Sequence, residues 1–473
     1  MKNCSAIQWF WCFIAFILST QANAQSNLDS NVIFTADEFI QVVKSFHPIV
    51  KQAALNVQMA KAAKLSARGA FDPSIYINSD QKTFDGKNYY TYTNPELKIP
   101  TWYGIEVKAG LENNGGLFLN DEVSAGKTSY LGVSVPVAKN LTMDRRRAVL
   151  KQASLFVQQS DAERLNTIND ILYDAYVAYY EWANRFQQYE IISTAVAVNQ
   201  ARFNLVKIGY RQGDRPAIDT VEALAQLQNF QFLQSEALVK FANAGVDLSN
   251  FLWLENDQPF TLPNTTIPEV FANASLNNVV PLLDELLLNA KLSHPKLAMT
   301  NFKIKSLTVE KQLKFQSLLP MVNLKANLLN KGYNVFKGAN AAFFQQNNKF
   351  GIDIGMPLRL SEGRGEYRRA KLKIKDAGYD LSLQQVQIAN KVRYYYNEMT
   401  ALRNQVNIME AALKNYQTLL RGETTRFNSG ESTLFVLNSR ENKVLETQQK
   451  LVELQNKYSK SLVAMQWAAG QLR

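Results

Sequence analysis

The sequence predicts a mainly α-helical chain in which long coiled-coil helix hairpins carry about four β-strands. Three observations lead to this fold class. Residues 137–208 contain neither glycine nor proline, and as a helix these 72 residues would run about 108 Å. Shorter segments alternate strictly between apolar and polar side chains, as strands between two unlike environments do. The same order of motifs also occurs twice, which indicates a duplicated unit.

The duplication is visible when two pairs of prolines are set in register. Pro48 and Pro73 are 25 residues apart, and so are Pro295 and Pro320. Three further motif pairs follow in the same order: YLGVSVPV (130–137) with FGIDIGMPL (350–358), DRRRAVLK (144–151) with EYRRAKLK (366–373), and YRQGD (210–214) with FNSGE (427–431). We therefore expect two repeats, residues 25–254 and 285–473, joined by a linker at 255–284.

The two histidines of the chain raise the question of a metal site. His47 and His294 each stand directly before a proline. Proline suits the first position of a helix, where its missing N–H is not needed. No acidic residue or cysteine recurs beside either histidine to complete a ligand set. The pattern therefore favours two equivalent helix starts over a metal site, and the sequence predicts neither a cofactor nor a catalytic residue.

The first 24 residues have the features of a signal peptide. Lys2 precedes an apolar stretch, and Ala22-Asn23-Ala24 provides a small-residue cleavage site. Cys4 and Cys12 are the only cysteines and both lie in this segment, so the exported chain would contain no disulfide. No later run of about 18 apolar residues predicts a membrane-spanning helix. A membrane role would therefore have to come from strands.

The expected elements recur in the same order in both repeats. A short helix at 35–46, with Thr35 as cap and Glu38 three residues later, precedes the first repeat's helix at 48–70. Strands at 74–137 and a helix hairpin at 138–253 follow it. The second repeat carries a helix at 295–318, strands at 321–358 and a hairpin at 366–469. Helices this long need coiled-coil partners. The two shorter helices of each repeat, placed end to end, match the length of the long one.

Strand 321–329 shows the alternation most clearly. One face carries only apolar side chains, and the other carries Asn323, Lys325 and Asn327. The apolar face, which we expect to meet lipid, consists of Val322, Leu324, Ala326 and Leu328. Open sheet edges cannot lie in lipid, and about four strands cannot close a barrel. Several chains would therefore have to share one barrel.

The order and double occurrence of these motifs resemble the TolC-like outer-membrane efflux proteins, over nearly the whole chain from Thr35 to Gly470. The resemblance implies a homotrimer with a shared twelve-stranded β-barrel in outer-membrane lipid, and an α-helical tunnel across the periplasm. It implies a channel that exports small molecules or proteins. It also implies two partners, a periplasmic adaptor (membrane fusion protein) and an inner-membrane pump of the RND or ABC type.

The resemblance further assigns a closing network to the two hairpin turns, at the periplasmic end of the tunnel. There an aromatic residue stands three positions before a glycine, and charged residues follow the glycine. The candidate gate residues are Tyr210, Gly213, Arg215, Asp219, Phe427 and Gly430. An ordinary solvated pair at i,i+4 spacing is the alternative interpretation of Arg215 and Asp219.

The second turn departs from the family pattern. Ser432 stands where an arginine is expected, and Val436 and Ser439 stand where two aspartates are expected. The acidic constriction of the family is therefore not matched in this repeat, and ion selectivity cannot be carried over.

Other classes of function fit the sequence less well. The chain has no phosphate-binding loop and no hydrolase motif, so we do not expect an enzyme. Its net charge of +11 is spread over helical runs that also contain acids, and no nucleic-acid-binding motif occurs. A periplasmic coiled-coil adaptor remains the alternative, but it would lack strands with one apolar face. A single-chain porin would need at least eight strands.

Overall fold

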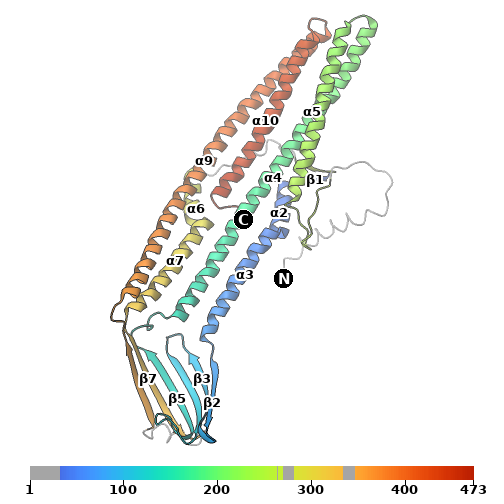
Figure 1. Ribbon diagram of the computed structural model, residues 1–473. Helices are drawn as coiled ribbons and strands as arrows, with labels where there is room; N and C mark the ends of the chain where they lie inside the picture. Colours follow the sequence, from blue (N-terminus) through green and yellow to red (C-terminus); the bar gives the residue numbers. More distant parts are fainter. Residues whose placement is uncertain (1–31, 264, 270–281, 334–346) are drawn as a thin grey trace, which may run out of the picture.

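The computed structural model describes residues 32–263, 265–269, 282–333 and 347–473. The expected signal peptide lies outside these residues. Figure 1 shows an elongated molecule with a β-sheet at one end and two helix hairpins that turn at the other. The chain passes twice from helix to strands and back into a long helix, so the order expected from the duplication is confirmed.

The helices occur in two matching sets. The first set is α2 (Ala36–Phe46), α3 (Pro48–Arg68), α4 (Arg145–Gln212) and α5 (Ala217–Ser249). The second set is α6 (Leu283–Ser293), α7 (Pro295–Phe315), α9 (Ser361–Asn428) and α10 (Leu434–Ala468). Among the residues described, no helix is long and apolar enough to cross a membrane.

The short helices complete the length of the long ones, as the sequence predicts. Both α3 and α5 pack along α4, and both α7 and α10 pack along α9. Toward the sheet, contacts run from α3 to α4, from α4 to α7 and from α7 to α9, so these four helices form one layer with α3 and α9 at its edges. Every long helix therefore has partners along its whole length.

The start of the first hairpin differs from the expected residue 138. Helix α4 begins at Arg145, because the Asp144 carboxylate accepts a hydrogen bond from the Arg147 backbone N–H at 2.8 Å and caps the helix. The backbone N–H groups of Val137 and Lys139 instead donate to Val322 and Pro320 and prolong the sheet. The absence of glycine and proline could not reveal this boundary.

The sheet contains six described strands, so the expected number of about four is too low. They are β2 (Ser74–Phe84), β3 (Lys87–Pro100), β4 (Glu106–Gly115), β5 (Gly126–Pro136), β7 (Met321–Lys331) and β8 (Asn348–Gly355). They lie in this order, and every neighbouring pair is antiparallel. The first repeat supplies four strands and the second supplies two.

The additional hairpin escaped the sequence analysis because its alternation breaks off. After Ile77, β2 continues with Ser79, Asp80, Gln81 and Lys82, which are polar on both faces. Period-two alternation therefore marks only the first part of this strand. Asp85 (φ 50°) and Gly86 (φ 67°) form the tight turn to β3, because both residue types tolerate the left-handed conformation that such hairpin turns need.

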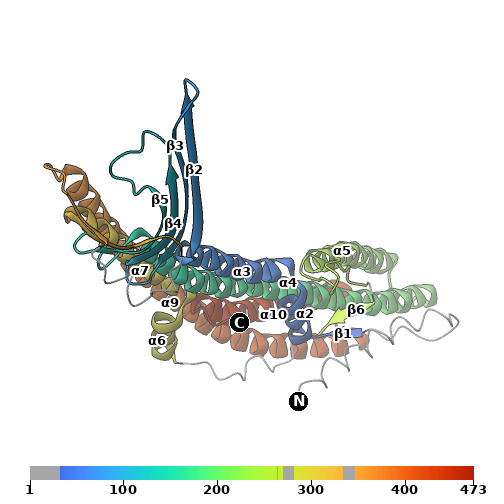
Figure 2. The same ribbon diagram turned by 90° about the horizontal axis from the view of Figure 1, so that it is seen from below.

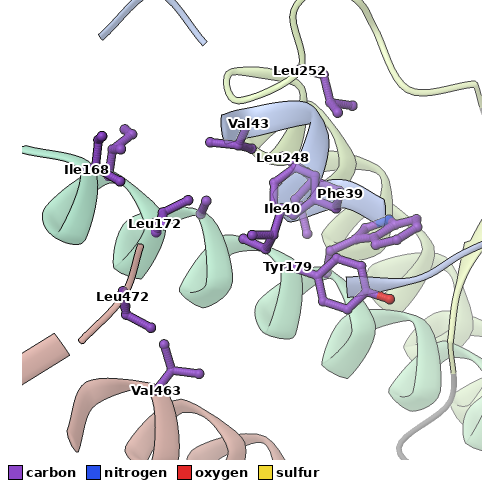
Figure 3. Packing of buried hydrophobic residues seen from close by; sticks show 14 residues of the cluster. Phe39, Ile40, Val43, Ile168, Leu172, Tyr179, Leu248, Leu252, Val463 and Leu472 are labelled. Atoms are coloured by element: carbon purple, nitrogen blue, oxygen red, sulfur yellow. The ribbon is translucent and has the colours of Figure 1, made fainter. Parts of the chain in front are cut away.

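A compact layer surrounds the middle of the helices. Strand β1 (Val32–Phe34) pairs in parallel with β6 (Thr266–Pro268), which belongs to the expected linker. Figure 3 shows Phe39, Ile40 and Val43 of α2 packed against Leu172 and Tyr179 of α4. The same cluster includes Leu248 of α5, Val463 of α10 and Leu472 near the C-terminus. Apolar burial at this level therefore joins segments from both repeats.

The two histidines begin α3 and α7, so the helix-start interpretation is confirmed. His47 Nδ1 accepts the backbone N–H of Ile49 at 3.2 Å, and His294 Nδ1 accepts that of Lys296 at 3.1 Å. An Nδ1 atom that accepts a hydrogen bond carries no proton. Burial lowers the pKa of His47, and burial followed by the charge of Lys296 lowers the pKa of His294 to about 4.

We predict that His294 makes the fold less stable in acid. Its folded-state pKa lies below its ordinary value of 6.5, so the unfolded chain binds the proton more tightly. Stability is fully present above pH 6.5 and falls as the pH drops toward 4, by about 3 kcal/mol at most. His294→Asn keeps a capping acceptor that does not titrate in this range. Thermal unfolding followed by circular dichroism at pH 7 and pH 4 should show a smaller loss of stability in this variant than in the parent protein. Equal losses in the two proteins would contradict the prediction.

Candidate functional site

The two hairpin turns lie side by side at the end of the molecule farthest from the sheet (Figure 1). Gly213 (φ 82°) and Gly430 (φ 76°) both adopt the left-handed conformation there, which glycine reaches without steric cost. The Gly213 N–H donates to the carbonyl of Tyr210, and the Gly430 N–H donates to that of Phe427. The two glycines are therefore the points where the long helices end and the chain reverses.

Arg215 connects the first turn to the second. Its guanidinium carbon lies 4.0 Å from the centre of the Phe427 ring, in a cation–π arrangement. Its Nη1 lies 3.6 Å from the Asp219 carboxylate, so the i,i+4 pair is present. The contact to Phe427 shows that Arg215 is more than one half of a solvated pair. Tyr210 lies near the same turn with 48% of its surface exposed.

A buried ion pair below the turns was missed by the sequence analysis. Both terminal nitrogens of Arg202 on α4 bind the Glu441 carboxylate on α10, Nη2 at 3.1 Å. The Arg202 and Glu441 side chains are only 15% and 10% exposed. Asn438 extends the network by donating to Glu222 of α5 at 3.0 Å. Because the two charges are 239 positions apart in the chain, no local pattern could have paired them.

Ser432 also has a partner that the sequence did not indicate. Its hydroxyl donates to the carboxylate of Glu423, which is only 9% exposed. Arg426 lies 3.9 Å from the same carboxylate. The residue that replaces the family's arginine therefore stabilises an acid of the preceding helix.

An apolar cluster holds the two turns together as one unit. Its buried members come from all four helices of the two hairpins: Val206, Ala223, Phe427, Leu434 and Leu437. Of the predicted gate residues, the structure thus brings Arg215, Asp219 and Phe427 into one contact group and places Gly213 and Gly430 in the turns beside it.

The sheet at the other end has one apolar face that extends over all six strands. Two rows of paired residues define it. The first row is Ile75, Leu97, Ala109, Leu131 and Leu328. The second row is Ile99, Val107, Val133, Ala326 and Phe350. Val322 and Leu324 pair with Ile354 and Ile352 on the same face. The four residues predicted to face lipid therefore belong to a continuous apolar surface.

The opposite face of the sheet is polar and rich in charge pairs. Lys98 binds Glu106 at 3.0 Å, and Lys108 binds Glu96 at 3.4 Å. The Tyr130 ring crosses directly over Gly110 to reach Glu96, an approach that any Cβ at position 110 would block. Lys325 forms an ion pair with Asp353. These side chains suit contact with water, and their partners on neighbouring strands also support the strand register.

Aromatic side chains border the apolar face at both ends of the strands. Tyr89 near the hairpin tip packs against Phe84 and Phe118. At the helix end, the Trp102 ring stacks on Phe71 at 4.2 Å. Aromatic girdles at both interfaces are typical of membrane β-structure. Phe343 and Phe344, two further aromatic residues of the sequence between β7 and β8, lie outside the described residues.

Comparison with known proteins agrees with this arrangement. Residues 286–471 match the family model described as outer membrane efflux protein. No curated protein in the search matches the sequence. The fold resembles the outer membrane protein VceC from Vibrio cholerae, with a TM-score of 0.63 at 16% identity over 92% of this chain and 96% of that one.

Two further solved structures are similar along nearly the whole chain. The Campylobacter jejuni CmeC outer membrane channel gives a TM-score of 0.63 at 12% identity, covering 92% of this chain and 86% of that one. The open state of the Neisseria gonorrhoeae MtrE outer membrane channel gives 0.63 at 14% identity, covering 96% and 95%.

Over residues 286–471 the chain matches the outer membrane efflux protein family, and over nearly its whole length it has the fold of outer membrane channels. It therefore belongs to the outer membrane and is not an enzyme. The TolC-like fold explains why one face of the sheet is apolar and why the hairpins are so long. Among the described residues, no group of three His, Cys, Asp or Glu side chains could hold a metal ion.

We predict that Arg202→Met destabilises the hairpin ends, because it leaves the buried Glu441 carboxylate without its partner. Breaking a buried ion pair costs about 3–5 kcal/mol, whereas an apolar replacement of both partners costs much less. The double variant Arg202→Met, Glu441→Met should therefore be more stable than the single one. Hydrogen exchange of the α4 and α10 amides near the turns measures this difference. If the destabilising effects of the two substitutions are additive, Arg202 and Glu441 are not energetically coupled.

Proposed function

We propose that three copies of this chain form one outer-membrane channel-tunnel that exports small molecules or proteins from the periplasm. The observation that carries the proposal is the continuous apolar face of a sheet whose two edge strands are open. Backbone N–H and C=O groups at an open edge cannot remain unpaired in lipid. Neighbouring copies can satisfy these groups and close the sheet into a barrel, with the charge pairs of the polar face lining the pore.

The helix layer supports the same assembly. Its edge helices α3 and α9 each keep apolar side chains more than half exposed in the single chain. These are Leu55, Met59 and Leu65 on α3, and Leu372, Tyr379, Leu383, Val386 and Tyr394 on α9. Coiled-coil helices normally bury such side chains against partners. Helix α3 leads into β2 and α9 follows β8, so the next copy would join both layers at the same edge.

The hairpin turns are the proposed gate at the periplasmic end of the tunnel. Within one chain both turns are tied together by the Arg215–Phe427 contact and the Arg202–Glu441 pair. In a trimer, the ends of three such units would meet around one axis. A periplasmic adaptor and an inner-membrane pump of the RND or ABC type are the proposed partners at this end. A soluble coiled-coil adaptor, the alternative function, would have no use for the apolar face of the sheet.

Assembly in the membrane should tolerate Lys325→Ala much better than Leu324→Arg. Leu324 lies in the middle of the apolar face, where an arginine facing lipid costs about 2–4 kcal/mol. Lys325 points to the opposite face, where its loss only frees Asp353. The yield of cross-linked trimer in the outer-membrane fraction is the measurement. Similar yields for the two variants would show that the faces are wrongly assigned, and a monomer in the parent protein would contradict the proposed assembly.

The gate assignment predicts that Arg215→Ala with Asp219→Ala raises single-channel conductance in planar bilayers. Without the guanidinium over Phe427, the first turn loses a contact that holds it to the second. Ser439→Ala is the matched control, because Ser439 lies on α10 near the second turn and is exposed. Unchanged conductance in the double variant, or an increase in the control, would argue against the assignment.

A further inference from the structure

The strands β2 and β3 are built like the rest of the membrane sheet. Ile75 on β2 pairs with Leu97 on β3, and Leu97 pairs with Ala109 on β4. All three lie on the apolar face. On the polar face, Tyr76 pairs with Glu96, and Glu96 binds Lys108 of β4. Figure 2 shows β2 and β3 standing beside β4 and β5. The first part of β2 and the last part of β3 thus continue both faces of the sheet without a change of side.

From this continuity we propose that every chain contributes all six strands to the barrel wall. The strand β8 of one chain then pairs with β2 of the next, and three chains of six strands give eighteen. The twelve-stranded barrel implied by the family resemblance would instead leave β2 and β3 outside the wall. The inference rests on the proposed trimeric channel.

The strand directions allow this closure. Neighbouring strands alternate in direction across the sheet, so with six strands the two edges run in opposite directions. β8 of one chain and β2 of the next are then antiparallel, as in other outer-membrane barrels. On the apolar face, the side chains of both edge strands are largely exposed in the single chain. Five of them are each more than 60% exposed: Ile75, Ile77, Phe350, Ile352 and Ile354.

The width of the sheet also fits the helix layer below it. Four helices spaced about 8–10 Å apart span about 32–40 Å. Six strands spaced about 4.8 Å apart and tilted by about 35–45° span about 35–41 Å. Four strands would span only about 23–27 Å under the same assumptions. Six strands per chain therefore let the barrel continue the tunnel at nearly the same circumference.

An eighteen-stranded barrel changes where the channel is narrow. Barrel diameter grows roughly linearly with strand number, so the mouth would be about 1.5 times as wide as with twelve strands. Barrels of this size leave an aqueous channel. The helix-hairpin end, and not the membrane barrel, would then limit the size of the exported molecule.

Disulfide cross-linking between chains tests which strands meet. Because Cys4 and Cys12 fall within the expected signal peptide, introduced cysteines should react only with each other. Ile352→Cys on β8 is combined with Ile75→Cys, Ile77→Cys or Ser79→Cys on β2, three positions that cover different registers. Ala109→Cys on β4, also combined with Ile352→Cys, is the matched control, because β4 would be the edge of a four-stranded wall. The full-length protein is oxidised in outer membranes with copper phenanthroline.

The inference predicts covalent dimers and trimers for at least one β2–β8 combination and none for β4–β8. A β4–β8 product, or the absence of every β2–β8 product in a particle that is trimeric in detergent, overturns the eighteen-stranded wall and leaves the trimeric channel intact. A particle that is not trimeric overturns the proposed function as well.

Discussion

The unpaired backbone of the edge strands β2 and β8 is the constraint on which the proposed architecture depends. Each buried N–H or C=O group without a partner in hydrocarbon costs several kcal/mol. The apolar face of the sheet extends to both edges, so these edges cannot be moved out of the membrane without exposing that face to water. The edge strands of such a sheet can pair their backbone groups only with further copies of the chain. The edge helices α3 and α9 also carry exposed apolar side chains, and they adjoin the edge strands β2 and β8, so the same neighbouring copies would cover them.

The two ends of the molecule are held together by different interactions. At the sheet, the polar face carries cross-strand ion pairs in an open, half-exposed setting, which suits a water-filled pore. At the hairpin turns, Arg202 and Glu441 are largely buried and make several hydrogen bonds. With the apolar cluster around Phe427, they join both hairpins of one chain into a single body.

Prediction from sequence succeeded where the pattern was local and repeated. The helix starts after His47 and His294 follow from a proline at the first helical position, and the structure adds that both imidazoles accept a backbone N–H there. The turn glycines Gly213 and Gly430 were recognised because the chain has to reverse there. The strand count failed at β2, since its outer half is polar on both faces and lacks the period-two alternation by which the other strands were recognised.

By itself the sequence determined the duplicated order of helices and strands, the helix starts at the two His-Pro pairs and the alternating faces of β7. These features depend on side chains that are close in the chain, with periods of 2 or 3.6 residues. Only the tertiary structure decided that six strands share one apolar face, that Arg215 lies over Phe427, and that Arg202 meets Glu441. Those contacts join residues of different repeats or hairpins, which approach one another only after the long helices have packed side by side.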